Sequence, residues 1–229
     1  MDYIAQGFIR SIQLLLAGDP ETYSAIFTTL RISSLSIVAS LIIGIPLGFL
    51  LGYFEFPGKR QVRAVVDTLL ALPTVVVGLF VYAFISRRGP LGEMGILFTI
   101  TGIAVAQTIL ITPIVVSLTA TAIESLDRRL RATLIALGAR GRQILITSLM
   151  EARYAVLVAA VTAYGRAISE VGISMMIGGN IKWHTRTITT AIALETGKGD
   201  FAVGMALGIV LLTLALVVNS SLTLLKKRS

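Results

Sequence analysis

Long runs of apolar residues alternate with short polar segments along most of the chain. Five runs are apolar over about twenty residues or more, at residues 26–53, 65–85, 96–119, 154–177 and 201–225. A helix rises about 1.5 Å per residue and the hydrocarbon core of a bilayer is about 30 Å thick, so each run can cross a membrane. The pattern predicts five transmembrane helices. Pro73 and Pro113 lie inside the second and third runs and predict kinks there.

The composition favours a membrane protein over a soluble one. Hydrophobic residues make up 55% of the chain, charged residues only 14%, and the mean hydropathy is +0.87. Soluble domains are about one quarter charged, so this chain lacks the polar side chains needed to cover one large core. A bilayer removes that need because lipid is the solvent. We therefore expect an all-α integral membrane protein. Residues 1–229 form a single transmembrane domain in this interpretation, because no fixed-period repeat or low-complexity linker divides them.

The net charge of +8 indicates an orientation in the membrane. Basic residues cluster at 59–63, at 128–142 and at 226–228. Five crossings place these clusters on one side, which the positive-inside rule makes cytoplasmic. The prediction is a multi-pass protein with its N-terminus outside and its C-terminus inside. We then expect the positive charge of the protein to contact membrane lipid, and we expect no nucleic-acid partner. The chain has no cysteine, which excludes thiolate chemistry and cysteine-ligated metals, and no metal site is expected.

The segment at residues 125–149 is too polar to span a bilayer and too apolar for a free loop. Its apolar residues recur at near-helical spacing on both sides of Gly138. We interpret it as two short cytoplasmic helices that meet at this glycine, which tolerates a turn and lets a partner approach closely. An ordinary pair of interfacial helices is the alternative.

This segment resembles the cytoplasmic coupling loop of importer-type ABC transporter permeases. The family pattern is Glu-Ala-Ala, three residues, Gly, nine residues, an aliphatic residue, one residue and Leu-Pro. Gly138 and the small Ala139 fit it, whereas Ala132, Thr133 and Leu134 occupy the Glu-Ala-Ala positions. Ser148 replaces the aliphatic residue, and Met150-Glu151 replaces Leu-Pro. The position of the segment, before the penultimate of five spans, also fits the family.

A second region resembles the permeases for molybdate and tungstate. These carry an Arg-Ala-x-x-Glu-x-Gly helix, an external Gly-Asn segment and a Thr-rich stretch before the last span. Arg166-Ala167, Glu170, Gly172, Gly179-Asn180 and Thr187–Thr190 follow this order. The run MMIGGNI followed by HTRTITT resembles the tungstate subgroup more than the molybdate one. The resemblance extends over residues 29–212.

The resemblance implies an importer-type ABC permease fold and a defined set of partners. They are a second copy of the chain in a homodimer, two ABC ATPase subunits and an extracytoplasmic oxyanion-binding protein, in a prokaryotic cytoplasmic (inner) membrane. ATP and Mg²⁺ would be bound by the ATPase, because this chain has no Gly-x4-Gly-Lys-Ser/Thr loop and is not expected to be an enzyme. The residues expected to dock on the ATPase are Ala132, Thr133, Leu134, Leu137, Gly138, Ala139 and Arg140. Transport would proceed by alternating access.

An oxyanion needs a polar path that does not trap it, which small hydroxyl donors provide better than a ring of arginines. The expected path residues are Ser33, Ser34, Ser36 and Ser40 in the first span, Thr108 and Thr112 in the third, and Arg166 with Glu170 in the fourth. The alternatives are hydroxyls that bond within or between helices and a structural i,i+4 ion pair. Lys182 and Arg186 are expected to contact the binding protein, or else to be plain solvated charges.

Two other functions remain open from sequence. An intramembrane enzyme would need a nucleophile and a base, for which Ser174 and His184 are the only Ser-His pair close in sequence. A permease of the same fold could instead carry molybdate, sulfate, phosphate or an amino acid. Tungstate is the expected cargo.

Overall fold

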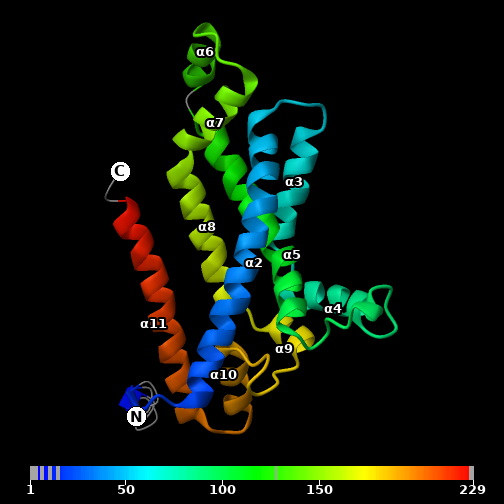
Figure 1. Ribbon diagram of the computed structural model, residues 1–229, viewed down its shortest axis with the longest axis vertical. Helices are drawn as coiled ribbons and strands as arrows, with labels where there is room; N and C mark the ends of the chain where they lie inside the picture. Colours follow the sequence, from blue (N-terminus) through cyan, green and yellow to red (C-terminus); the bar gives the residue numbers. More distant parts are fainter. Residues whose placement is uncertain (1–4, 6–7, 10–11, 14–15, 127, 227–229) are drawn as a thin grey trace.

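The computed structural model describes residues 5, 8–9, 12–13, 16–126 and 128–226, and these form helices and loops without a strand. The elements, in chain order, are α2 (Pro20–Tyr53), α3 (Lys59–Leu70), α4 (Thr74–Ile85), η1 (Gly92–Met94), α5 (Ile100–Glu124), α6 (Arg128–Ala136), α7 (Gly141–Glu151), α8 (Arg153–Ile168), α9 (Gly172–Gly178), α10 (Ile188–Gly197) and α11 (Phe201–Lys226). The long helices α2, α5, α8 and α11 run roughly along the length of the molecule (Figure 1).

Within the described residues, three helices, α2, α5 and α11, are long and apolar enough to cross a membrane on their own. Two bent pairs, α3 with α4 and α7 with α8, raise the number of possible spans to five. The expected all-α, five-span architecture is therefore confirmed.

The second predicted span is wrong as a single helix. Helix α3 ends at Leu70 and α4 begins at Thr74, with an angle of 96° between them. Pro73 precedes α4 with ψ 127°, in extended backbone. Proline has no N–H to donate and disfavours helical geometry in the residue before it, so the predicted kink becomes a full break. Helix α4 consequently projects sideways from the bundle (Figure 1).

The fourth predicted span also ends early. Helix α8 stops at Ile168, residues 169–171 are not helical, and α9 begins at Gly172. Residues 188–197, which lie between the fourth and fifth predicted spans, form helix α10, whose first turn at Ile188, Thr189, Thr190 and Ala191 is buried. The Thr187 side chain accepts the backbone N–H of Thr190 and caps this helix.

Helices α2 and α5 form the central contact of the fold along a stripe of small residues. On α2 the stripe recurs every fourth residue, at Ser36, Ser40, Gly44, Gly48 and Gly52. A Cβ atom at Gly48 would lie 2.6 Å from the backbone oxygen of Val116 and 2.7 Å from the Cβ of Thr119. Small residues at this spacing let two membrane helices approach closely, so van der Waals contact can hold them where lipid provides no hydrophobic drive.

The two ends of the molecule differ in charge. The α2–α3 loop, α6 and α7 lie at one end, toward which α11 also runs (Figure 1). We call this the basic end, because the basic clusters at residues 59–63 and 128–142 lie there. The start of α2, α10 and the loop at residues 179–187 lie at the opposite end, here called the far end. The predicted gathering on one side is therefore seen for these two clusters, whereas residues 227–228 of the third lie outside the described residues.

Candidate functional site

A glycine-centred turn joins α6 to α7 at the basic end. The N–H of Gly138 donates to the oxygen of Ile135 at 2.9 Å, and the N–H of Ala139 donates to the oxygen of Leu134 at 2.9 Å. Gly138 has φ +75°, in the left-handed region. These bonds form a Schellman motif with glycine at its C′ position, the arrangement that terminates many helices. The sequence signal at Gly138 thus corresponds to a sharp reversal of the chain.

Most residues of the turn have exposed side chains. Leu137 is 77% exposed and Ile135 is 55% exposed, and a Cβ atom at Gly138 would meet nothing within 4 Å. Arg140 precedes α7, and its N–H donates to Gln143 Oε1 at 2.7 Å. Among the other predicted docking residues, Thr133 and Arg140 are exposed, and Leu134 and Ala139 are half-buried. Ala132 lies in α6, but its side chain is outside the described part of the structure.

Four of the predicted path hydroxyls of α2 and α5 face one another across the helix contact: Ser36, Ser40, Thr108 and Thr112. Ser33 is buried on α2. Ser36 Oγ lies 2.9 Å from Gln107 Oε1, and Ser40 Oγ donates to the oxygen of Thr108 at 3.3 Å. Thr112 Oγ1 lies 3.4 Å from Ser40 Oγ. In this conformation these groups join two helices, one of the two readings that the sequence left open. Their role in a path stays a prediction.

Ser34 differs from these residues because it is exposed. Its Oγ lies 3.3 Å from the hydroxyl of Tyr164 on α8.

Glu170 sits at the break between α8 and α9. Its side chain is only 2% exposed, and its Oε2 lies 3.3 Å from Nη1 of Arg166, whose side chain is 41% exposed. Its Oε1 accepts the N–H of Ile173 at 3.1 Å, and its backbone oxygen accepts the hydroxyl of Thr189 at 2.7 Å. The carboxylate therefore caps α9, and the backbone oxygen ties the chain break to the start of α10. The predicted Arg166–Glu170 pair is present, and Glu170 also has this structural task.

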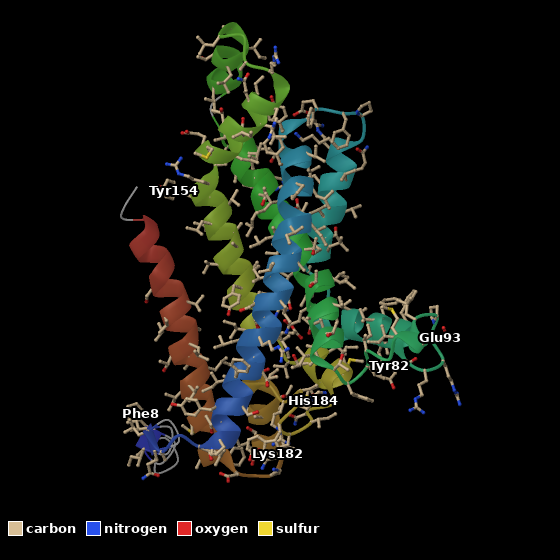
Figure 2. All side chains as sticks on the ribbon, viewed as in Figure 1. Phe8, Tyr82, Glu93, Tyr154, Lys182 and His184 are labelled. Atoms are coloured by element: carbon tan, nitrogen blue, oxygen red, sulfur yellow. The ribbon has the colours of Figure 1, made fainter. Side chains whose placement is uncertain are left out.

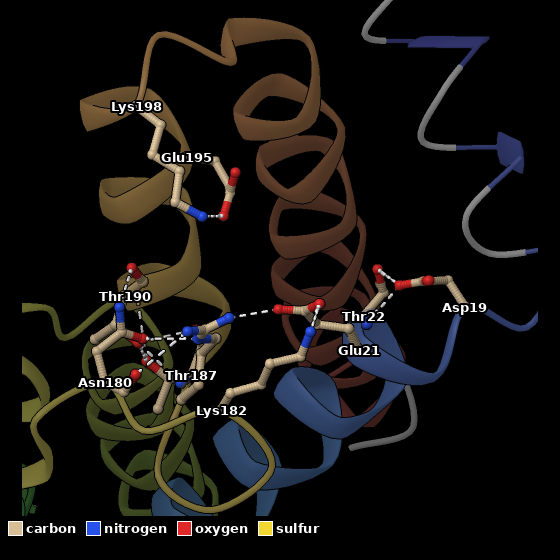
Figure 3. A network of polar contacts seen from close by, with 10 residues as sticks. Asp19, Glu21, Thr22, Asn180, Lys182, Thr187, Thr190, Glu195 and Lys198 are labelled. Atoms are coloured by element: carbon tan, nitrogen blue, oxygen red, sulfur yellow. Dashed lines mark hydrogen bonds and ion pairs between the residues drawn. The ribbon is translucent and has the colours of Figure 1, made fainter.

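Lys182 and Arg186 belong to an ion-pair network at the far end (Figure 3). Both approach the carboxylate of Glu21, with Lys182 Nζ 2.6 Å from Oε2 and Arg186 bonded to Oε1. Arg186 also donates to Asn180 Oδ1 at 3.2 Å. Both cations thus share a single carboxylate within the chain, and a contact with a binding protein stays a prediction.

Two side chains in this arrangement were assigned no role from the sequence. Gln107, 2% exposed, links α5 to α2 through Ser36 and to α8 through the oxygen of Ala167 at 3.4 Å. Arg31 lines a pocket at the far end. The available signal was the same for both, a strongly polar residue inside a predicted span.

The arrangement of Ser174 and His184 does not support a Ser-His nucleophile. Ser174 Oγ is buried and has no hydrogen-bond partner among the described residues, whereas His184 is exposed at the far end (Figure 2). An activated serine is hydrogen-bonded to its base.

Comparison with known proteins relates the sequence to transport systems. Residues 44–229 match the family described as binding-protein-dependent transport system inner membrane component. The chain is 48% identical to the tungstate uptake system permease protein TupB of Campylobacter jejuni, over 96% of this chain and 92% of that protein. It is 39% identical to the TupB of Peptoclostridium acidaminophilum, over 96% of each chain.

The fold is shared with a solved transporter. The inward-facing MetNI methionine ABC transporter superposes with a TM-score of 0.75, at 20% identity, over 91% of this chain and 95% of that chain. At this level of identity the similarity concerns the fold alone.

Proposed function

The chain belongs to the family of binding-protein-dependent transport system inner membrane components, and from this premise we propose that it is the permease subunit of an ATP-driven importer of tungstate. The observation that supports tungstate as the cargo is the 48% identity, over nearly the full length of both chains, to a tungstate uptake permease. A second tungstate permease, at 39% identity, supports the same cargo. Molybdate and sulfate, which share the tetrahedral oxyanion shape, are the alternatives.

The proposed assembly consists of two copies of this chain, two ABC ATPase subunits and an extracytoplasmic oxyanion-binding protein. Each chain is too small to enclose a transport path by itself. A twofold assembly places a shared path on the axis between the two copies. The basic end faces the cytoplasm and the far end faces the binding protein, in line with the positive-inside rule. ATP and Mg²⁺ belong to the ATPase, and this chain catalyses no reaction.

The Gly138 turn is proposed to dock in a groove of the ATPase. Leu137 supplies an exposed apolar side chain, and Gly138 leaves room for the partner's backbone. Helix α7 continues into α8 through a bend of 61°. Movement of the turn is thereby passed to a membrane helix, and nucleotide binding biases one of two states of the permease.

In this proposal the oxyanion passes along hydroxyl and backbone donors of both copies. Opening of the α2–α5 contact would expose Ser36, Ser40, Thr108 and Thr112. The Arg166–Glu170 pair supplies a charge that is already partly neutralised, so the passing anion is attracted without being held tightly.

The experiment that tests the function is uptake of tungsten by cells. Deletion of the gene for this chain should lower cell tungsten when tungstate is supplied at nanomolar concentration, and the plasmid-borne gene should restore it. Excess molybdate and excess sulfate, added separately, measure selectivity. Unchanged tungsten content, together with a loss of sulfate-dependent growth, would reject tungstate in favour of sulfate.

A further inference from the structure

A polar pocket of about 400 Å³ opens at the far end, between α2, the start of α5 and the loop at residues 179–187. The lining residues with charged or hydrogen-bonding side chains are Ser24, Thr28, Arg31, Thr99, Thr101, Trp183 and His184. None of the nine lining residues is acidic. Figure 2 shows His184 at this end of the molecule, near Lys182. The pocket is separate from the Arg166–Glu170 pair and from the Gly138 turn.

Arg31 is the strongest indication of a ligand. It lies twelve residues into α2, roughly 16 Å along the helix from Pro20, and is exposed on the same face as Phe27 and Thr28. Among the described residues it forms no hydrogen bond and no ion pair. An ionised side chain within a membrane helix is costly, and it is normally paired or placed at a path for ions or substrates. The part of the chain that the structure describes supplies no partner for Arg31, so an external anion fits the position.

The start of α5 adds donors to the same pocket. Ile100 and Thr101 occupy the first turn of this 25-residue helix and line the pocket. Thr99 uses its own hydroxyl to cap Gly102, at 3.1 Å, and to bond the oxygen of Ile96, at 2.6 Å. The N–H groups of Ile100 and Thr101 have no such partner among the described residues. Free N–H groups at a helix N-terminus, with the positive end of its dipole, favour bound anions.

The loop that presents Trp183 and His184 is held in a fixed shape. The hydroxyl of Thr185 donates to the oxygen of Gly178 at 2.5 Å and accepts the N–H of Ile181 at 3.1 Å. Trp183 has φ +66°, in the left-handed region that bulky residues rarely adopt. Phe98, directly before the cap of α5, has φ +60°. Strained backbone of this kind is concentrated at binding and switch sites.

We propose that this pocket binds a tetrahedral oxyanion, and that the transported anion occupies it on its way from the binding protein to the path. The inference rests on the proposed function for its cargo. Such an anion offers four acceptor oxygens and no donor. The residues that line the pocket carry matching hydrogen-bond donors, namely a guanidinium, an imidazole, an indole N–H, hydroxyls and two backbone N–H groups. Lys182 Nζ lies 5.1 Å from the centre of the Trp183 ring and shares the Glu21 carboxylate with Arg186, so the three charged groups together carry one net positive charge.

The same chemistry would accept the phosphate of a lipid headgroup, so the experiment must distinguish the two sources. Trp183 is the single tryptophan of the chain, and its emission therefore reports on this pocket alone. The full chain is purified in a maltoside detergent, which contains no phosphate. It is titrated with sodium tungstate, with glycerol 3-phosphate as a soluble headgroup, and with sodium chloride at matched ionic strength.

Tungstate is expected to change the emission of Trp183 saturably, while chloride does not. Arg31→Gln should weaken the apparent affinity at least tenfold, and Arg31→Lys less. Arg88→Gln, which alters an exposed arginine outside the pocket, should bind like the unmodified chain. A wild-type chain that does not respond to tungstate overturns the proposal. Saturation by glycerol 3-phosphate alone overturns it too, because the pocket then holds lipid.

Uptake measurements separate this inference from the proposed function. With the ATPase and binding protein present, Arg31→Gln should raise the tungstate concentration needed for half-maximal uptake, and Arg88→Gln should not. Normal uptake by Arg31→Gln with a silent Trp183 rejects the pocket and leaves the function standing. A response of Trp183 in a chain that never imports tungstate rejects the function and leaves the anion site.

Discussion

Glu170 shows how one buried charge can end a helix inside a predicted span. Residues 154–177 are apolar enough to continue as one helix, yet α8 ends at Ile168. The carboxylate accepts the N–H of Ile173, which has no partner in a helix that starts at Gly172. The sequence reveals the charge and its i,i+4 partner Arg166. It does not reveal the second bond, because this depends on where the chain turns.

Replacement of Glu170 tests this reading. Glu170→Ala should lower the free energy of unfolding in detergent by about 1–3 kcal/mol, because the buried N–H of Ile173 loses its acceptor. Glu170→Gln keeps an acceptor oxygen and loses only an ion pair to a half-exposed arginine, so its effect should be clearly smaller. Thermal unfolding followed by circular dichroism measures both, with exposed Glu93→Ala as the control. Equal damage from Gln and Ala would show that the charge, and not the cap, stabilises the fold.

At the scale of elements, close packing of α2 on α5 organises the bundle. The α2 stripe from Ser36 to Gly52 leaves no room for larger side chains, as the 2.6 Å approach at Gly48 shows. The same contact is where the predicted path hydroxyls meet. An opening of the path through this contact therefore requires two closely packed helices to separate, which agrees with a transition between two discrete states.

A leucine in the stripe should disrupt this contact. Gly48→Leu places side-chain atoms against backbone atoms of α5, which cannot yield as a flexible side chain can, so we expect a loss of well over half of the folded protein. Gly208→Leu is the matched control, because a Cβ at that position in α11 meets nothing within 4 Å. The yield of monodisperse protein in size-exclusion chromatography decides between them. Similar yields for both variants would contradict the packing account.

The sequence predicted helices better than it predicted their breaks. Apolar runs identify spans because each span must be apolar throughout, and four of the five runs contain a long helix, α2, α5, α8 or α11. Pro73 signalled a kink, but the size of the bend depends on what α4 packs against, including α9. Helix α10 was missed because a ten-residue helix with hydroxyl-rich sequence has no strong apolar period. The Gly138 turn was identified because glycine marks left-handed backbone locally.

At the scale of the molecule, the proposed orientation can be tested with cysteines. The chain has none, so single replacements report without background. Arg88→Cys and Lys198→Cys should react with a membrane-impermeant maleimide on intact spheroplasts. Ala136→Cys, next to the Gly138 turn, should react only after the membrane is permeabilised. Labelling of Ala136→Cys from outside would reverse the orientation and remove the turn from the reach of a cytoplasmic ATPase.

In the proposed transporter, the Gly138 turn connects a separate ATPase to the membrane helices, and uptake by a tryptophan variant tests this connection. Gly138 and Gly95 both have left-handed backbone, with φ +75° and +60°, and a Cβ at either meets nothing within 4 Å. Gly138→Trp and Gly95→Trp therefore carry similar strain in different places. Tungstate accumulation is measured in cells that hold equal amounts of folded variant. Gly138→Trp should abolish uptake, whereas Gly95→Trp should retain it. Undiminished uptake by Gly138→Trp would contradict the proposed connection.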